Sequence, residues 1–225
     1  MDKQLWTAVD EYTTGLLMPP DPALEAALAA SDAAGLPSIS VTPSQGKLLM
    51  MLAQLAGASQ ILEVGTLGGY SSIWLARALK PGGCLVTLEA EPKHAEVARS
   101  NIARAGFANA VEVRLGDARA SIQQLVAEGR GPFDLFFIDA DKKSIPHYLE
   151  WSIKLSRRGS LIIIDNVIRD GALIDAESKD ANVQGVRRMH EMLAADSRLS
   201  ATTIQTVGSK GYDGFTLALV TTDII

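Results

Sequence analysis

From residue 60 onward, short apolar runs alternate with segments of helical pattern, and this alternation constrains the fold more than any other feature of the chain. The apolar runs have the length of strands, and they occupy residues 60–64, 84–89, 110–116, 133–139 and 160–165. A helical segment follows each of them, which is typical of βαβ units and a parallel sheet. The last two runs lack polar alternation, as expected for strands covered by helices on both faces. The sequence therefore predicts an α/β fold with a doubly wound sheet.

The end of the chain departs from this pattern. After a helix expected at residues 183–196 come two strand-like runs, residues 200–207 and 214–220. The segment between them, residues 208–214, contains three glycines and indicates a hairpin turn. We therefore expect the last two strands to be antiparallel neighbours in an otherwise mostly parallel sheet.

The N-terminal part of the chain is expected to be helical. Residues 21–35 are rich in strong helix formers, and Pro43 stands in the first turn of another helical segment. We interpret residues 1–40 as an added helical layer and residues 41–225 as a Rossmann-like core. Together they are expected to form a single domain over residues 1–225.

The overall composition excludes several classes of protein. The net charge is −5 and no block of basic residues occurs, so nucleic-acid binding has little electrostatic support. The single cysteine, Cys84, cannot form an internal disulfide, and no set of Cys and His has the spacing of a zinc site. The N-terminus does not resemble a signal peptide, and the apolar stretches are far shorter than the ~20 residues that span a bilayer. We therefore expect a soluble, cytoplasmic protein that binds neither nucleic acid nor membranes.

Polar side chains appear where the predicted strands end, and ligands of open α/β sheets bind in the crevice beyond those ends. Asp139 and Asp165 close the fourth and fifth strands, which the βαβ order makes neighbours, and Asn166 follows at once. These three residues offer only oxygen atoms, which suit a hard cation such as Mg²⁺, or Ca²⁺ or Mn²⁺, better than zinc. We predict that Asp139, Asp165 and Asn166 form a metal site.

A glycine-rich loop follows the first strand, at residues 63–72. Such a turn brings backbone N–H groups close to a ligand at a helix N-terminus. It does not match the dinucleotide fingerprint G-x-G-x-x-G, because Leu67 occupies the position of the middle glycine. Glu89, at the end of the second strand, stands about 20 positions beyond Gly65, where an acidic residue binds ribose hydroxyls. The predicted ligand therefore contains a ribose but need not contain phosphate groups. S-adenosylmethionine fits this description, because it joins an adenosine to an amino acid through a sulfonium.

Three more residues have positions that suit this methyl donor. Glu63, directly before the glycine loop, could receive the ammonium group of the donor or compensate its positive sulfonium. Asp117 and Ala118 lie at the end of the third strand, where the adenine is expected.

Lys142 is the candidate general base, because it comes three residues after Asp139. Beside a divalent cation a lysine ammonium loses its proton more readily, and it could then accept a proton from a hydroxyl made acidic by the metal. Lys143 competes for this role, and Asp141 lies beside both lysines.

Five motifs in this order resemble the cation-dependent O-methyltransferases of the caffeoyl-CoA and catechol O-methyltransferase type. The motifs are ILEVGTLGGYSSIWLA, LEAEPKHAEVARSNI, GDA, FIDADK and IIIDNV. The resemblance runs from about Val41 to the end of the chain. It implies a seven-stranded methyltransferase sheet with a reversed last hairpin. It also implies a homodimer that methylates vicinal dihydroxy aromatic compounds.

The resemblance further implies a role for individual residues. The residues expected to contact the donor are Val41, Glu63, Gly65, Thr66, Ser71, Glu89, Asp117, Ala118 and Asp139. Those expected to bind the metal are Asp139, Asp165 and Asn166, and the catalytic pair is Lys142 with Asp139.

The chain departs from the plant caffeoyl-CoA enzymes where the acceptor is expected. Arg169 and Asp170 stand in place of a Trp and an Asn, and the segment at residues 208–214 is longer than the plant GDG turn. Two other functions remain as alternatives. One is an NAD-dependent Rossmann oxidoreductase, and the other is a non-catalytic binding protein with the methyltransferase fold.

Overall fold

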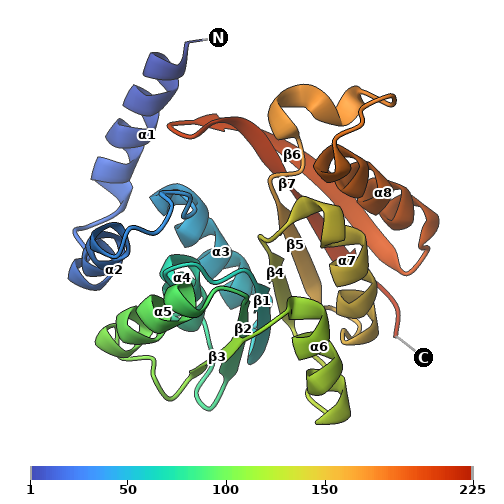
Figure 1. Cartoon of the computed structure of the whole chain (residues 1–225), viewed down its shortest axis with the longest axis horizontal. Helices are drawn as coiled ribbons and strands as arrows, with labels where there is room; N and C mark the ends of the chain where they lie inside the picture. Colours follow the sequence, from blue (N-terminus) through green and yellow to red (C-terminus); the bar gives the residue numbers. More distant parts are fainter. Residues whose placement is uncertain (1, 224–225) are drawn as a thin grey trace.

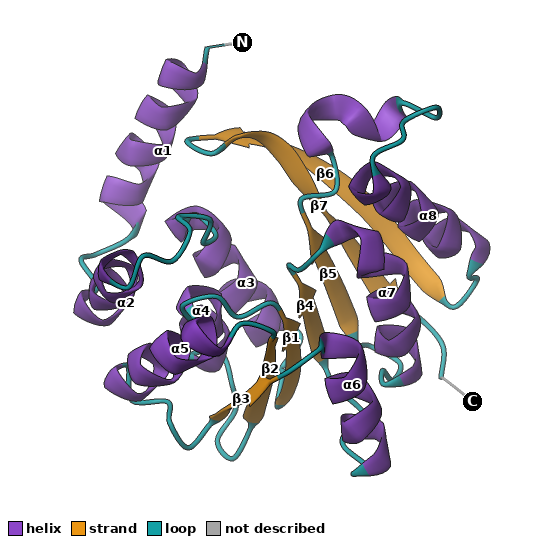
Figure 2. Cartoon of the chain, in the orientation of Figure 1, coloured by secondary structure: helices purple, strands orange, loops and turns teal. Residues whose placement is uncertain are grey.

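A computed structural model describes residues 2–223 and contains one seven-stranded sheet, as predicted (Figure 2). The strand order is β3-β2-β1-β4-β5-β7-β6. The strands are β1 (Gln60–Val64), β2 (Cys84–Glu89), β3 (Val111–Leu115), β4 (Leu135–Ile138), β5 (Leu161–Asp165), β6 (Leu199–Gly208) and β7 (Gly211–Val220). β1 to β5 are parallel, whereas β7 runs antiparallel to both β5 and β6. The doubly wound, mostly parallel sheet with an antiparallel C-terminal hairpin is therefore confirmed.

Helices cover both faces of the sheet (Figure 1). One face carries α3 (Pro43–Leu55), α4 (Tyr70–Ala76) and α5 (Pro92–Arg104), and the other carries α6 (Ala118–Ala127), α7 (Ile145–Lys154) and α8 (Ala181–Ala195). Each face has its own apolar core, and the strands contribute side chains alternately to the two cores. Among the helices of residues 2–223, none is long and apolar enough to cross a membrane.

Two further helices, α1 (Lys3–Leu17) and α2 (Pro22–Ala33), form the N-terminal layer. α2 packs on α5, where the side-chain amide of Asn101 donates to the carbonyls of Ala27 and Gly68. α1 extends away from the body of the protein and has no buried residue (Figure 1). Asp10 of α1 makes a polar contact with the C-terminal hairpin, because its carboxylate accepts a hydrogen bond from the Ser209 N–H at 2.8 Å.

The largest differences between the predicted and the observed elements occur at the helix after β1 and at the C-terminal hairpin. The helical segment expected after the first strand has the sequence YSSIWLARAL, residues 70–79, but the helix ends at Ala76 because the N–H groups of Ala78 and Leu79 bond back to the carbonyls of Leu75 and Ala76. The hairpin turn expected at residues 208–214 is only two residues long, since Gly208 pairs directly with Gly211. Strands β6 and β7 therefore continue through most of the predicted loop. Two short 3₁₀ helices that the sequence pattern did not indicate are η1 (Lys142–Ser144) and η2 (Arg169–Ile174).

Candidate active site

A cleft opens at the carboxyl ends of the parallel strands, where the chain order reverses between β1 and β4. This reversal is the switch point at which open α/β sheets bind their ligands. The cleft contains a cavity of about 580 Å³. Loops that follow all five parallel strands contribute residues to its wall, and the segment before α3 closes it from one side. The predicted site residues therefore come from separate parts of the chain and meet at one place.

The glycine loop after β1 forms one wall of this cavity. Gly65 has a φ of +100°, and a Cβ at this position would lie 2.1 Å from the carbonyl oxygen of Asp139. Only glycine combines this conformation with so close an approach of two backbones. Gly69, with a φ of +81°, begins α4. The loop thus brings the N-terminus of α4 and the end of β4 together.

Glu89 lies at the end of β2 and is almost fully buried. One of its oxygens, Oε2, accepts hydrogen bonds from the Thr66 N–H at 3.2 Å and the Leu67 N–H at 2.7 Å. The other, Oε1, accepts one from the Glu91 N–H at 3.0 Å. Glu89 therefore fixes the glycine loop, and it also lines the cavity, together with His94.

Glu63 differs from the other predicted donor residues, because it does not line the cavity. Its side chain is fully buried below the loop, and its carboxylate accepts hydrogen bonds from the hydroxyls of Ser71, at 2.5 Å, and Ser72. Burial raises the pKa of Glu63 to about 7, although these hydroxyl donors act in the opposite direction. The structure places Glu63 behind Ser71, which does line the cavity.

The remaining predicted donor residues lie around the cavity. Its wall includes Val41, Gly65, Thr66, Ser71, Asp117, Ala118 and Asp139. Asp117 caps α6, since its carboxylate accepts hydrogen bonds from the N–H groups of Arg119 and Ala120. Ala118, the first residue of α6, therefore has a fixed position against the cavity.

The predicted metal residues lie together where β4 and β5 end side by side. Asp139 and Asn166 line the cavity, and Asp165 is buried next to them. Asp165 accepts a hydrogen bond from the Asn166 N–H at 2.8 Å, and Asn166 has the left-handed φ of +56°. Burial and the negative charge of Asp139 raise the pKa of Asp165 to about 7. Two carboxylates that repel each other in a buried place are suited to a cation.

The chemistry of these ligands fits a hard cation better than a transition metal. Within residues 2–223 no three His, Cys, Asp or Glu side chains form a cluster that could hold a metal ion. A metal site at this place therefore depends on the amide oxygen of Asn166 as its third protein ligand. A set of two carboxylates and one amide leaves the remaining positions of an octahedral ion to water or to a ligand.

Lys142 lies directly beside this cluster and is buried. Its ammonium is 3.0 Å from Oδ1 of Asp139. η1 carries Lys142 and packs closely against α8, where a Cβ on Gly185 would come within 2.2 Å of the Lys142 carbonyl oxygen. The competing Lys143, in contrast, is exposed and does not line the cavity. The geometry therefore separates the two candidate bases.

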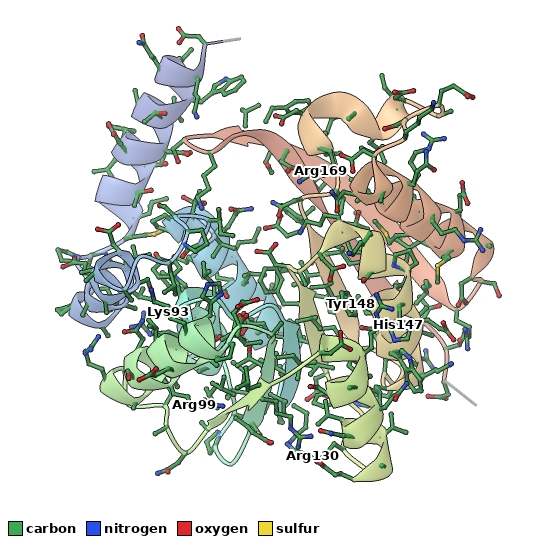
Figure 3. The ribbon with its side chains drawn as sticks, in the orientation of Figure 1. Lys93, Arg99, Arg130, His147, Tyr148 and Arg169 are labelled. Carbon is green, nitrogen blue, oxygen red and sulfur yellow. The ribbon has the colours of Figure 1, made fainter. Side chains whose placement is uncertain are left out.

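Some cavity residues were not predicted from the sequence. Tyr148 of α7 lines the cavity and donates a hydrogen bond to Asp141 at 2.8 Å. Figure 3 labels Tyr148 on α7 and Arg169 on η2. The unpredicted wall residues also include Ile39, Ser40, Tyr70 and His94. The sequence contained a signal for His94, because a residue in the first turn of the helix after Glu89 lies near the end of a strand, where the cleft is expected.

The strand order of the sheet and the position of the cleft are those of class I methyltransferases. Comparison with known proteins then identifies the family. A family model described as O-methyltransferase matches residues 22–220, and the chain belongs to this family. The predicted enzyme class, an O-methyltransferase, is therefore confirmed. Neither the oxidoreductase alternative nor the non-catalytic alternative is supported.

Individual relatives cover nearly the whole chain. A catechol O-methyltransferase of Niastella koreensis is 52% identical and covers 98% of this chain and 100% of its own length. An O-methyltransferase from Bacillus cereus, solved in complex with SAH, has a TM-score of 0.96 at 56% identity and covers 97% of this chain and 100% of its own. The O-methyltransferase TomG from Streptomyces achromogenes is involved in tomaymycin synthesis and was solved in complex with SAM. It has a TM-score of 0.95 at 53% identity and covers 98% of this chain and 99% of its own.

Proposed function

We propose that this chain is an S-adenosylmethionine-dependent and divalent-metal-dependent O-methyltransferase that acts on vicinal dihydroxy aromatic compounds. The observation that carries the proposal is the meeting of three features at one cleft: Glu89 at the end of β2, the neighbouring Asp139 and Asp165, and the buried Lys142. Relatives that are solved with SAM or SAH, and relatives called catechol O-methyltransferase, support the donor and the acceptor class. We infer that residues 1–225 act as a single domain.

The donor is proposed to bind between the glycine loop and α6. Glu89 has the position from which a carboxylate accepts hydrogen bonds from ribose hydroxyls. Ser71 and the N–H groups at the start of α4 suit the amino-acid end of the donor, because a helix N-terminus favours a carboxylate. Asp117 and Ala118 lie where the adenine is expected. Glu63 is proposed to act through Ser71, which its carboxylate holds in place.

Lys142 is proposed to accept the proton of the attacking hydroxyl. The side-chain nitrogen of Lys142 lies 3.0 Å from Oδ1 of Asp139, and Asp139 thereby positions the base beside the cleft. Lys142 would take up the proton as the neutral amine and become the ammonium. A bound Mg²⁺ ion, held by Asp139, Asp165 and Asn166, would make a neighbouring hydroxyl more acidic. The sulfonium of S-adenosylmethionine supplies the methyl group, which passes to the acceptor oxygen in one displacement. Orientation in a cleft sheltered from water accounts for much of the acceleration.

Removal of the metal tests this assignment. We expect excess EDTA to abolish methylation of a catechol, measured as transfer of label from S-[methyl-¹⁴C]adenosylmethionine. Added Mg²⁺ should restore it, and binding of the donor by calorimetry should change much less than turnover. Full turnover in EDTA, after metal analysis shows that the protein is metal-free, would contradict the metal dependence.

We also propose that two copies associate through α1. Leu5, Val9, Tyr12 and Leu16 are exposed and follow the spacing i, i+4, i+7, i+11, which is the apolar seam of a coiled coil. α1 projects from the protein, so this seam is accessible to a second copy (Figure 1). We expect the double variant Tyr12→Glu/Leu16→Glu to be a monomer in sedimentation velocity, whereas wild type and the control Glu11→Gln are dimers. A wild-type monomer at the same concentration would exclude this association.

A further inference from the structure

A second cavity of about 620 Å³ adjoins the predicted active site. Ile39, Asn166 and Arg169 line both cavities, so the two spaces meet beside the predicted metal site. The second cavity lies between the segment before α3, the start of η2 and the β6–β7 hairpin. A molecule that reached Asn166 from this side would contact these three segments.

Arg169 stands at the junction of the two cavities. Its backbone has the left-handed φ of +56°, and its N–H donates to Oδ1 of Asp213 at 3.1 Å. The Nε atom of its guanidinium group is buried but has no hydrogen-bond partner in the part of the chain that the structure describes. A buried donor without a partner costs free energy, which a ligand can recover. Figure 3 labels Arg169 where η2 begins.

Lys210 supplies a second positive charge from the turn of the hairpin. It lines the second cavity, and its ammonium donates a hydrogen bond to the carbonyl of Ser40. Burial lowers the pKa of Lys210, whereas the charges of Asp139 and Asp165 act in the opposite direction. Lys210 and Asn166 line the same cavity, so the ammonium and the predicted metal site border one space.

Three acidic residues also line the second cavity, but two of them already accept hydrogen bonds from backbone N–H groups. Asp213 accepts hydrogen bonds from the N–H groups of Ile168, Arg169 and Gly214. Asp10 accepts one from the Ser209 N–H. The third, Asp170, is exposed. Within residues 2–223 neither Arg169 nor Lys210 forms an ion pair, and both line this cavity, so their charges are available to an anion.

Building on the proposed function, we propose that the preferred acceptor is an aromatic ortho-diol that carries a carboxylate, and that Arg169 and Lys210 bind this carboxylate. The planar guanidinium of arginine matches a carboxylate with two parallel hydrogen bonds, which an ammonium cannot do. Arg169 is accordingly the main contact, and Lys210 adds charge from the turn between β6 and β7. Diols without an anionic group would still be substrates, with lower kcat/KM.

A matched pair of acceptors tests this inference. The two compounds are 3,4-dihydroxybenzoate and its neutral analogue 3,4-dihydroxybenzamide, and the measured quantity is the ratio of their kcat/KM values with Mg²⁺ and S-adenosylmethionine. We expect wild type to prefer the acid, and Arg169→Met to lower the ratio about 10-fold or more. Arg169→Lys should restore part of it, and Lys210→Met should lower the ratio less. Arg188→Met, an exposed change on α8, serves as the control that leaves the ratio unchanged.

The outcomes separate this inference from the proposed function. If wild type methylates neither compound, the proposed function fails. If it methylates both and Arg169→Met changes both equally, only the carboxylate site is wrong. Calorimetry with S-adenosylmethionine supplies a second measurement, because the donor affinity of Arg169→Met should equal that of wild type. A large loss of donor affinity would assign Arg169 to the donor and overturn the inference.

Discussion

Replacement of Lys142 by methionine is expected to lower kcat by about 10²–10⁴-fold, with little change in the affinity for S-adenosylmethionine. Lys142 is the buried lysine that is paired with Asp139 at the edge of the cleft. Methionine is an unbranched side chain only one atom shorter than lysine, and it cannot accept a proton. Stopped-flow or quench measurements of a single turnover would report the chemical step directly, and calorimetry would report donor binding.

Lys143→Met is the matched control, because the neighbouring lysine is exposed and points to no cavity wall. It should retain the kcat of wild type. Raising the pH should partly rescue Lys142→Met, because a catechol that is already ionised needs no base. If Lys142→Met and Lys143→Met lost kcat equally, the reaction would depend on the 142–143 segment as a whole and not on the amine of Lys142.

Asp165→Asn is expected to remove activity and to stabilise the metal-free protein at the same time. The change removes one charged metal ligand, and we expect kcat/KM to fall about 10²-fold or more at a fixed Mg²⁺ concentration. In EDTA at pH 8, however, the substitution removes a buried charge that Asp139 repels. The free energy of unfolding of the variant should therefore exceed that of wild type by about 1–3 kcal/mol. Activity assays and chemical denaturation measure the two effects, and a variant that loses both activity and stability would contradict this account.

The pH dependence of stability follows from the same raised pKa. Asp165 has a pKa of about 7 in the folded protein but near 3.8 when unfolded, so the folded state holds its proton more tightly. The free energy of unfolding of the metal-free protein should therefore decrease as the pH rises from about 4 to about 7. Burial of Glu63 acts in the same direction over the same range. Asp165→Asn should make this decrease shallower in denaturation experiments at pH 4 to 8, and an unchanged slope would show that Asp165 is not its source.

The parallel part of the fold could be predicted from the sequence because strand and helix alternate with clear periods. The oxygen-bearing side chains directly after apolar runs gave the position of the cleft, and β4 and β5 bring Asp139 and Asp165 together as expected. The sequence favoured Lys142 as the base through its spacing from Asp139 and through the family resemblance, but it left Lys143 as a competitor. The choice depends on how η1 packs against Gly185 of α8, a contact between segments about 40 positions apart.

The acceptor side of the site was less accessible to prediction. The glycines at residues 208, 211 and 214 suggested a long loop, but they are needed within the paired strands. A Cβ on Gly214 would lie 2.3 Å from the Ile204 carbonyl oxygen, and Gly211 has a φ of +104°. The turn is therefore tight and carries Lys210 toward Ser40. Glu63 also shows that proximity in sequence to the glycine loop does not imply access to the cavity, since its carboxylate is satisfied by serines of α4.

The hydrogen bond between Asp10 and Ser209 joins the outermost helix to the residue next to Lys210. The same helix, α1, carries the apolar seam through which we propose that two copies associate. The proposed association of two copies and the proposed binding of an acceptor carboxylate are therefore connected through one side chain, Asp10. We expect substitutions on α1 that change how two copies meet to shift acceptor selectivity even when every residue of the cleft is kept.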